Sequence, residues 1–248
     1  MKAFSIIGLH NSGKTTAVEG LINYLKSKNI SVSSIKDIHQ ADFTMEKKGS
    51  NTQRHLQASN TYVFARGINE THLIWNRQLP FKEMIKHITT EWLIIEGMKE
   101  LPLPKIISAK TREEIDTLFD DTVFAITGPY SEKKTDYRGI PVINSIIDIN
   151  RLGELTIEKV FDLLPFANEG YCNHCGYNCL EMTKMILKGQ KTRNDCGLKK
   201  NVNLKIYFDE TEIPLNDWTE KLTTDLITSI CENLKGYKKG ANIKILIK

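Results

Sequence analysis

The stretch Gly8-Leu9-His10-Asn11-Ser12-Gly13-Lys14-Thr15 is the most informative part of this chain, because it matches the pattern G-x-x-x-x-G-K-[ST] at every defined position. The apolar run 4–9 before it predicts a buried strand, and residues 14–28 after it have apolar side chains at helical spacing. In this strand–loop–helix context, backbone N–H groups of the loop face phosphate oxygens, and the helix N-terminus favours negative charge. We therefore expect a nucleotide site here.

The chemistry of this loop indicates which residues contact the nucleotide and its metal ion. Lys14 would reach the β- and γ-phosphates, and the Thr15 hydroxyl would coordinate Mg²⁺. A second magnesium ligand is expected at the end of a neighbouring strand, where Glu96 follows an apolar run. Asp37 and His39 follow the second predicted strand, at the edge of the sheet where ligands bind. Each of them either contacts the metal ion, positions a water molecule or lies in a solvated loop. The predicted nucleotide-binding set is Gly8, His10, Asn11, Ser12, Gly13, Lys14, Thr15 and Thr16, and the predicted catalytic set is Lys14, Glu96 and Asp37.

Apolar runs of strand length alternate with helical periodicity over the first two thirds of the chain. Strands are predicted at 4–9, 32–36, 61–65, 72–75, 92–96, 105–108 and 123–127, and helices at 14–28, 80–87, 111–119 and 153–164. Strands that alternate with helices form crossover units and a parallel sheet. The predicted fold is a three-layer α/β P-loop NTPase domain with a mostly parallel sheet.

A break near residues 165–170 separates this part from the rest of the chain. We expect three units: a nucleotide-binding domain over 1–165, a four-cysteine module over 166–200 and a small αβ unit over 201–248. The cysteine module contains a predicted helix at 180–188 that Gly189 ends. In the last unit, alternating apolar residues predict strands at 202–208 and 243–247, with a helix at 215–234 between them.

Composition excludes several classes of protein. The 248 residues carry 34 Lys and Arg against 30 Asp and Glu, and a net charge of +4 is too small to favour a nucleic-acid partner. No apolar run approaches the ~18 residues that span a membrane, and the N-terminus does not have the pattern of a signal peptide. We expect a cytoplasmic protein with no membrane association.

Four of the five cysteines lie close together, at Cys172, Cys175, Cys179 and Cys196. In a reducing compartment such a cluster favours metal over disulfides. A zinc ribbon usually has two separated Cys-x₂-Cys pairs, whereas three local ligands and one remote ligand suit a [4Fe–4S] cluster. The stretch resembles the four-cysteine iron–sulfur module of Rnf-type subunits and corrinoid proteins, although the second interval there is commonly one residue longer. We favour iron–sulfur, and zinc and no metal remain as alternatives.

Several blocks of the first 165 residues, taken in order, resemble the MobB family. They are the phosphate loop, Ile35-Lys36-Asp37-Ile38-His39, Gly49-Ser50-Asn51-Thr52-Gln53-Arg54-His55, Ile94-Ile95-Glu96-Gly97 and Pro104-Lys105-Ile106. The resemblance implies GTP as the nucleotide, although spacing alone does not choose between GTP and ATP. It also implies a slow GTPase, a homodimer, a role in molybdopterin-guanine dinucleotide biosynthesis, and a molybdenum-cofactor guanylyltransferase or a molybdenum or tungsten enzyme as partner.

The chain departs from the family pattern at two places. Asp37 and Gln40 stand where the family usually has histidines, and Ser50 with Asn51 replaces a lysine and a carboxylate. Two other functions remain open. One is an NTP-driven maturation or transfer protein that holds a metallocluster on its cysteines, and the other is a docking module with a structural metal.

Overall fold

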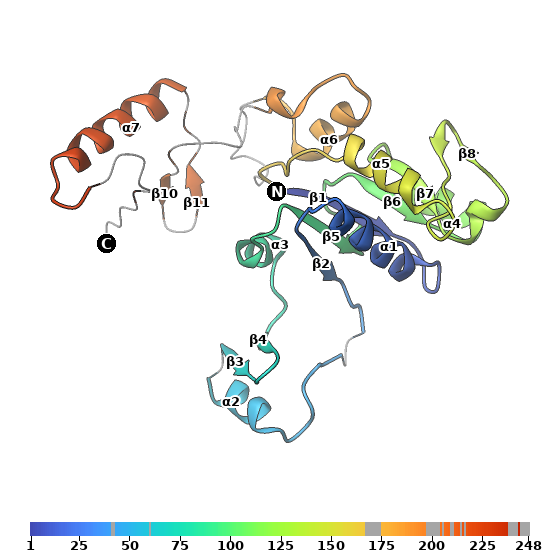
Figure 1. Cartoon of the computed structure of the whole chain (residues 1–248), viewed down its shortest axis with the longest axis horizontal. Helices are drawn as coiled ribbons and strands as arrows, with labels where there is room; N and C mark the ends of the chain where they lie inside the picture. Colours follow the sequence, from blue (N-terminus) through green and yellow to red (C-terminus); the bar gives the residue numbers. More distant parts are fainter. Residues whose placement is uncertain are drawn as a thin grey trace.

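The computed structural model describes residues 1–40, 43–59, 61–166, 175–196, 204, 206–208, 211–213, 215, 217–237 and 243. Its centre is a five-stranded parallel sheet with strand order β2-β5-β1-β6-β7 (Figure 1). The strands are β1 (Lys2–Ile7), β2 (Val32–Lys36), β5 (Trp92–Glu96), β6 (Lys105–Ser108) and β7 (Val123–Thr127). The predicted α/β class and parallel sheet are confirmed.

Helices cover both faces of this sheet, which explains why β1, β5 and β7 are mostly apolar and almost entirely buried. On one face, α1 (Lys14–Ser27) and α5 (Ile149–Lys159) pack Leu21, Leu25 and Leu152 against Phe4 and Ile94. On the other face, α4 (Arg112–Leu118) buries Ile115 against β6 and β7, and α3 (Phe81–Met84) buries Phe81 against β5. The arrangement is the predicted three-layer fold.

One predicted helix is wrong in its position. A helix was expected at 153–164, but α5 begins at Ile149. Its N-cap is Asp148, whose side chain accepts a hydrogen bond from the Arg151 N–H. Gly153 lies inside this helix rather than at its start. A Cβ atom at Gly153 would lie 2.2 Å from the Tyr24 ring, so the glycine allows α5 to approach α1 closely.

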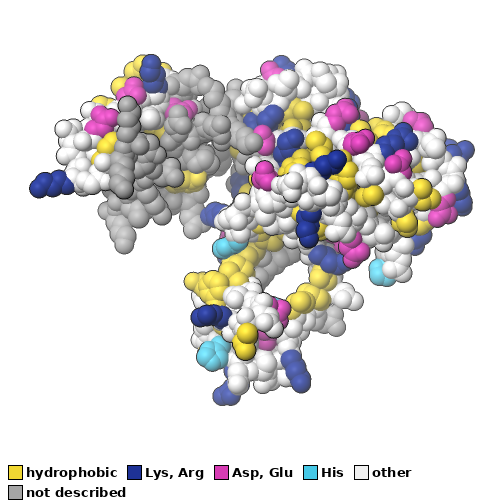
Figure 2. All heavy atoms as spheres, viewed as in Figure 1, with side chains coloured by type: hydrophobic (Ala, Val, Ile, Leu, Met, Phe, Trp, Pro, Cys, Tyr) yellow, Lys and Arg dark blue, Asp and Glu magenta, His cyan; other side chains and the backbone are white. Residues whose placement is uncertain are grey.

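The described residues between β2 and α3 form an arm that extends away from the sheet (Figure 1). The two predicted strands in this region, β3 (Tyr62–Arg66) and β4 (Thr71–Trp75), are present, but they pair with each other in a separate antiparallel hairpin. A helix that was not predicted, α2 (Asn51–Ser59), precedes them. Figure 2 shows hydrophobic side chains on the surface of the arm, where Tyr62 and Phe64 are exposed.

The segment after the break docks on the part of the chain that contains the central sheet. Its helix α6 (Cys179–Leu187) begins with a capping box between Asn178 and Glu181, and Gly189 follows its end with a φ of 71°. The Thr183 hydroxyl donates to the Pro102 carbonyl oxygen at 2.9 Å, and the Arg193 guanidinium donates to the carbonyl oxygens of residues 162 and 163.

The remaining elements are short, except for one helix near the C-terminus. They are η1 (Ile85–His87), η2 (Pro129–Glu132), β8 (Asp136–Tyr137), β9 (Ile140–Pro141), η3 (Arg193–Asp195), β10 (Ile206–Phe208), β11 (Thr211–Ile213) and α7 (Asp217–Glu232). β10 pairs with β11 in a hairpin, and the predicted strand at 243–247 lies, apart from Ile243, outside the described residues. Within the described part of the chain, no helix is long and apolar enough to cross a membrane.

Candidate functional site

The phosphate loop, residues 8–15, joins β1 to the N-terminus of α1 and makes close backbone contacts with neighbouring strand ends. A Cβ atom at Gly8 would lie 2.2 Å from the Ser108 carbonyl oxygen, so only glycine fits there. Gly13 has a φ of 93°, which favours glycine, and its carbonyl accepts the Ala17 N–H at 3.1 Å. The loop therefore has the strand–loop–helix setting that the motif requires.

A hydrogen bond from β6 fixes the middle of the loop. The Ser108 hydroxyl donates to the Ser12 carbonyl oxygen at 2.7 Å, and both serines are fully buried. The Ser12 hydroxyl has no hydrogen-bond partner among the described residues. By contrast, His10, Asn11 and Thr16 are exposed. The predicted binding residues thus form one continuous loop whose rim faces solvent.

Lys14 folds back over this loop. Its ammonium donates to the Leu9 carbonyl oxygen at 2.6 Å. Burial, more than any neighbouring charge, lowers the pKa of Lys14 from its ordinary value, and the Glu96 carboxylate partly opposes this effect. An anion that bound beside Lys14 would relieve the cost of burying this charge.

The predicted magnesium ligands contact each other across two elements. The Thr15 hydroxyl, at the start of α1, lies 3.1 Å from both carboxylate oxygens of Glu96 at the end of β5. The ammonium of Lys36 lies 3.0 Å from Glu96 Oε1 and 3.3 Å from Thr15 Oγ1. A hydroxyl and a carboxylate are oxygen donors of the kind that Mg²⁺ prefers, and a cationic group already contacts both, so these residues fit the ion.

Asp37 lies beside this group at the end of β2. Its N–H donates to the Glu96 carbonyl oxygen at 2.9 Å, and its carboxylate lies 3.3 Å from His39 Nε2. Gly97, with a φ of 106°, leaves room for the Asp37 side chain, since a Cβ atom there would lie 2.9 Å from Asp37 Cβ. The parallel pairing of β2 with β5 therefore brings Asp37 and Glu96 to the same edge of the sheet.

Sequence reasoning missed two residues of this site, Lys36 and Ser108. Lys36 appeared only within a predicted strand and within a block of the family resemblance, with no role at the site, although it is paired in register with Glu96. Its place as the last residue of a strand beside Asp37 is the signal that identifies it, because polar residues at the carboxyl ends of parallel strands gather around ligands. Ser108 ends β6 in the same way.

Three of the four predicted metal-binding cysteines belong to the described part of the chain, and Cys172 lies outside it. Cys175, Cys179 and Cys196 are thiols that join one hydrophobic cluster around Met182. No group of three His, Cys, Asp or Glu side chains that could hold a metal ion is found among the residues that the structure describes. The structure therefore does not show the predicted [4Fe–4S] cluster.

The phosphate loop at the end of a central parallel strand, next to the strand-end carboxylate Glu96, defines a protein of the P-loop NTPase fold. The family model described as "Molybdopterin guanine dinucleotide synthesis protein B" (MobB) matches residues 3–128, which is slightly more than half of the chain. The chain therefore belongs to the MobB family, as the sequence blocks indicated.

Individual relatives agree with this assignment. A protein of Methanocaldococcus jannaschii, named a putative molybdopterin-guanine dinucleotide biosynthesis adapter protein, is 27% identical over 254 residues, covering 100% of this chain and 97% of the relative. A probable adapter protein of the same kind from Bacillus subtilis is 25% identical over 144 residues, covering 56% of this chain and 83% of the relative. The crystal structure of Bacillus subtilis MobB superposes with a TM-score of 0.55 at 21% identity, covering 66% of this chain and 100% of that one, which supports the fold.

Proposed function

We propose that this chain binds GTP with Mg²⁺ and acts as an accessory protein in molybdopterin-guanine dinucleotide biosynthesis. The observation that carries the proposal is the contact between Thr15 and Glu96 beside a well-formed phosphate loop, in a chain of the MobB family. The relatives whose names mention this pathway include one that aligns over the whole chain. The loop would hold the phosphates through its backbone N–H groups and Lys14.

The same residues suggest slow GTP hydrolysis. Lys14 would neutralise charge on the phosphates, Thr15 and Glu96 would hold the metal ion, and Asp37 would position water beside it. A bound magnesium ion would supply further charge stabilisation at the phosphates. Hydrolysis would then release the contacts between the γ-phosphate and these residues, which hold this edge of the sheet in one arrangement. The change in arrangement would alter the access of a partner protein to this part of the surface. The partner in this proposal is a molybdenum-cofactor guanylyltransferase or a molybdenum or tungsten enzyme, and the protein acts as a homodimer.

Calorimetric titration tests the nucleotide. We expect GTP to bind in the presence of Mg²⁺ with a clear preference over ATP, and Lys14→Ala to abolish binding. Lys26→Ala is the matched control, because Lys26 is an exposed lysine on the same helix and lies away from the loop. ATP preference in the wild-type protein, or equal loss in both variants, would contradict the proposal.

A deletion strain tests the pathway. We expect it to accumulate less molybdopterin-guanine dinucleotide, and a pull-down with the tagged full chain to recover an enzyme that makes or carries the pterin cofactor. Normal cofactor content together with no such enzyme would reject this part of the proposal. It would favour instead an NTP-driven protein that matures or transfers a metallocluster.

We also propose that the cysteine segment binds a [4Fe–4S] cluster, with zinc as the alternative metal. The support is that Cys175, Cys179 and Cys196 belong to one hydrophobic cluster of side chains around Met182. Cys172 precedes them in the same segment of the sequence. Protein purified without oxygen should be brown, absorb near ~400 nm and contain about four irons per chain. Cys175→Ser should lose the colour, whereas Cys231→Ser should keep it. Colourless protein with one zinc ion would reject iron–sulfur.

A further inference from the structure

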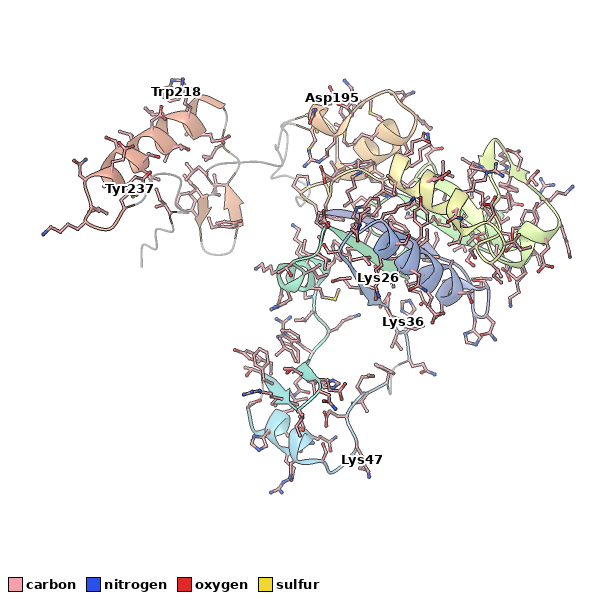
Figure 3. All side chains as sticks on the ribbon, in the orientation of Figure 1. Lys26, Lys36, Lys47, Asp195, Trp218 and Tyr237 are labelled. Carbon is pink, nitrogen blue, oxygen red and sulfur yellow. The ribbon has the colours of Figure 1, made fainter. Side chains whose placement is uncertain are left out.

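The ammonium of Lys36 contacts both of the oxygens to which the magnesium ligation is assigned. It lies 3.0 Å from Glu96 Oε1 and 3.3 Å from Thr15 Oγ1. Figure 3 labels Lys36 where β2 ends, at the base of the arm. Because β2 and β5 are parallel neighbours and Lys36 is in register with Glu96, the backbone itself directs this side chain to the carboxylate.

The spacing of these two oxygens suits a small divalent cation. Thr15 Oγ1 lies 3.1 Å from Glu96 Oε1. Two neighbouring ligands of an octahedral Mg²⁺ ion, each about 2.1 Å from the metal, lie about 3.0 Å apart. An ion that used both oxygens would compete with Lys36, whose ammonium already donates a hydrogen bond to each of them, and the two cations would repel each other.

The two partners of this ion pair differ in their freedom to move. The Glu96 side chain is only 11% exposed, whereas the Lys36 side chain is 55% exposed at the end of a flexible stem. Lys14 is a second ammonium group whose charge interacts with the same carboxylate. The Glu96 carboxylate therefore already interacts with two ammonium groups. Lys36 is the more exposed of the two partners in its ion pair, so moving its side chain away when a divalent cation binds costs little free energy.

We propose that Lys36 is a built-in competitor of the divalent cation at Thr15 and Glu96. Loading of the metal then requires the ammonium of Lys36 to leave, and Lys36 sets the cation concentration at which the site fills. This inference rests on the proposed function, because the site is the one that would bind the metal–nucleotide complex.

Manganese binding followed by electron paramagnetic resonance tests the competition, with and without the non-hydrolysable GTP analogue GMPPNP. Lys36→Met keeps the length of the side chain and removes its charge. We expect this variant to bind Mn²⁺ about five-fold more tightly than the wild-type protein, since a partly exposed ion pair contributes about that factor. Lys36→Arg should remain within about two-fold of the wild type.

Lys188→Met is the matched control. Lys188 is 48% exposed and pairs with Asp121 at 2.9 Å, away from Thr15 and Glu96, so its loss should leave Mn²⁺ affinity unchanged. Equal Mn²⁺ affinity in Lys36→Met and the wild type, or weaker binding in the variant, would overturn the inference. Failure of the wild type to bind GMPPNP would reject the proposed function, and the titration without nucleotide would still measure the competition.

A crystal structure of the wild-type protein with Mn²⁺ and GMPPNP provides a second measurement, which does not depend on whether the variants fold. We expect Lys36 Nζ beyond hydrogen-bonding distance of Glu96 when the metal is bound. Mn²⁺ on Thr15 and Glu96 with Lys36 still hydrogen-bonded to both oxygens would show that the lysine and the metal do not compete.

Discussion

Glu96 is the residue at which the contacts of the candidate site converge. It ends β5, is 9% exposed, and accepts hydrogen bonds from Thr15 and Lys36. A carboxylate in this position has two possible roles, to hold the metal ion or to hold α1 against the sheet. The dependence of nucleotide affinity on Mg²⁺ separates the two roles.

Glu96→Gln should weaken GTP binding by about ten-fold or more in the presence of Mg²⁺, because a neutral amide is a poor ligand for this ion. Binding in a chelator should stay near the wild-type value. Calorimetry under both conditions measures the difference. Glu91→Gln is the control, since Glu91 lies just before β5 at its other end and accepts hydrogen bonds from Ser31. An equal loss with and without Mg²⁺ would indicate a structural role.

Lys14 should make nucleotide binding at the phosphate loop depend on pH. Its pKa lies below the ordinary 10.5 because of burial, and a bound phosphate would raise this pKa again. Nucleotide binding therefore takes up a proton at alkaline pH. The affinity for the nucleotide should be highest below the pKa that Lys14 has in the free protein. It should decrease as the pH rises through that pKa towards 10.5.

Calorimetry in buffers of different ionisation enthalpy measures this proton uptake. Lys14→Arg is the control, because arginine stays charged over the whole range and titration of the guanine base contributes equally to both proteins. An identical decrease in both proteins would exclude Lys14 as the source of the pH dependence.

At the scale of elements, the sequence predicted the parallel strands well because both faces of the sheet are covered. β1 and β5 are therefore apolar along nearly all their length, and short apolar runs next to glycine-rich or polar turns are visible without a structure. The phosphate loop was predictable for the same reason, since its residues are adjacent in the chain. The contact of Lys36 with Glu96 was not, because strand order brings together residues 60 positions apart.

The errors have local causes. β3 and β4 were correctly predicted as strands, but periodicity does not reveal which sheet a strand joins, and both lie in the arm. α2 escaped prediction because it buries only Leu56 and so has a weak apolar pattern. α5 was placed too late because Gly153 was read as the start of the helix, whereas the packing of Tyr24 explains this glycine.

Gly153→Ala tests that explanation of α5. In an exposed helix, replacing glycine by alanine stabilises by about 1 kcal/mol. Here the new Cβ would lie 2.2 Å from the Tyr24 ring, so we expect the variant to lose about 2 kcal/mol of unfolding free energy instead. Urea unfolding measures the difference, with the exposed neighbour Glu154→Ala as the control near zero. A stabilised Gly153→Ala protein would show that the ring moves aside freely.

In the molecule as a whole, the cysteine segment is attached to the part that contains the central sheet by contacts of two kinds. A partly buried contact comes from Arg193, which donates to the carbonyl oxygens of residues 162 and 163, and a buried one comes from Met182, which packs against Leu164. A surface contact comes from the ion pair of Lys188 with Asp121, in which both side chains are about half exposed. These two kinds of contact differ in energy, because solvent screens the exposed pair.

Arg193→Met should therefore loosen the docking of α6, whereas Lys188→Met should not. The arginine variant leaves two carbonyl oxygens without a charged donor, and we expect a local loss of about 2 kcal/mol. Amide hydrogen exchange in α6 should become about 30-fold faster, while exchange in β1 and β5 stays unchanged. Equal protection of α6 in both variants would show that the hydrophobic cluster and the Thr183–Pro102 hydrogen bond hold the segment without Arg193. Cys179 and Cys196 lie in that hydrophobic cluster. If the Arg193→Met variant keeps the protection of α6, it should therefore also keep any metal ion that these cysteines bind.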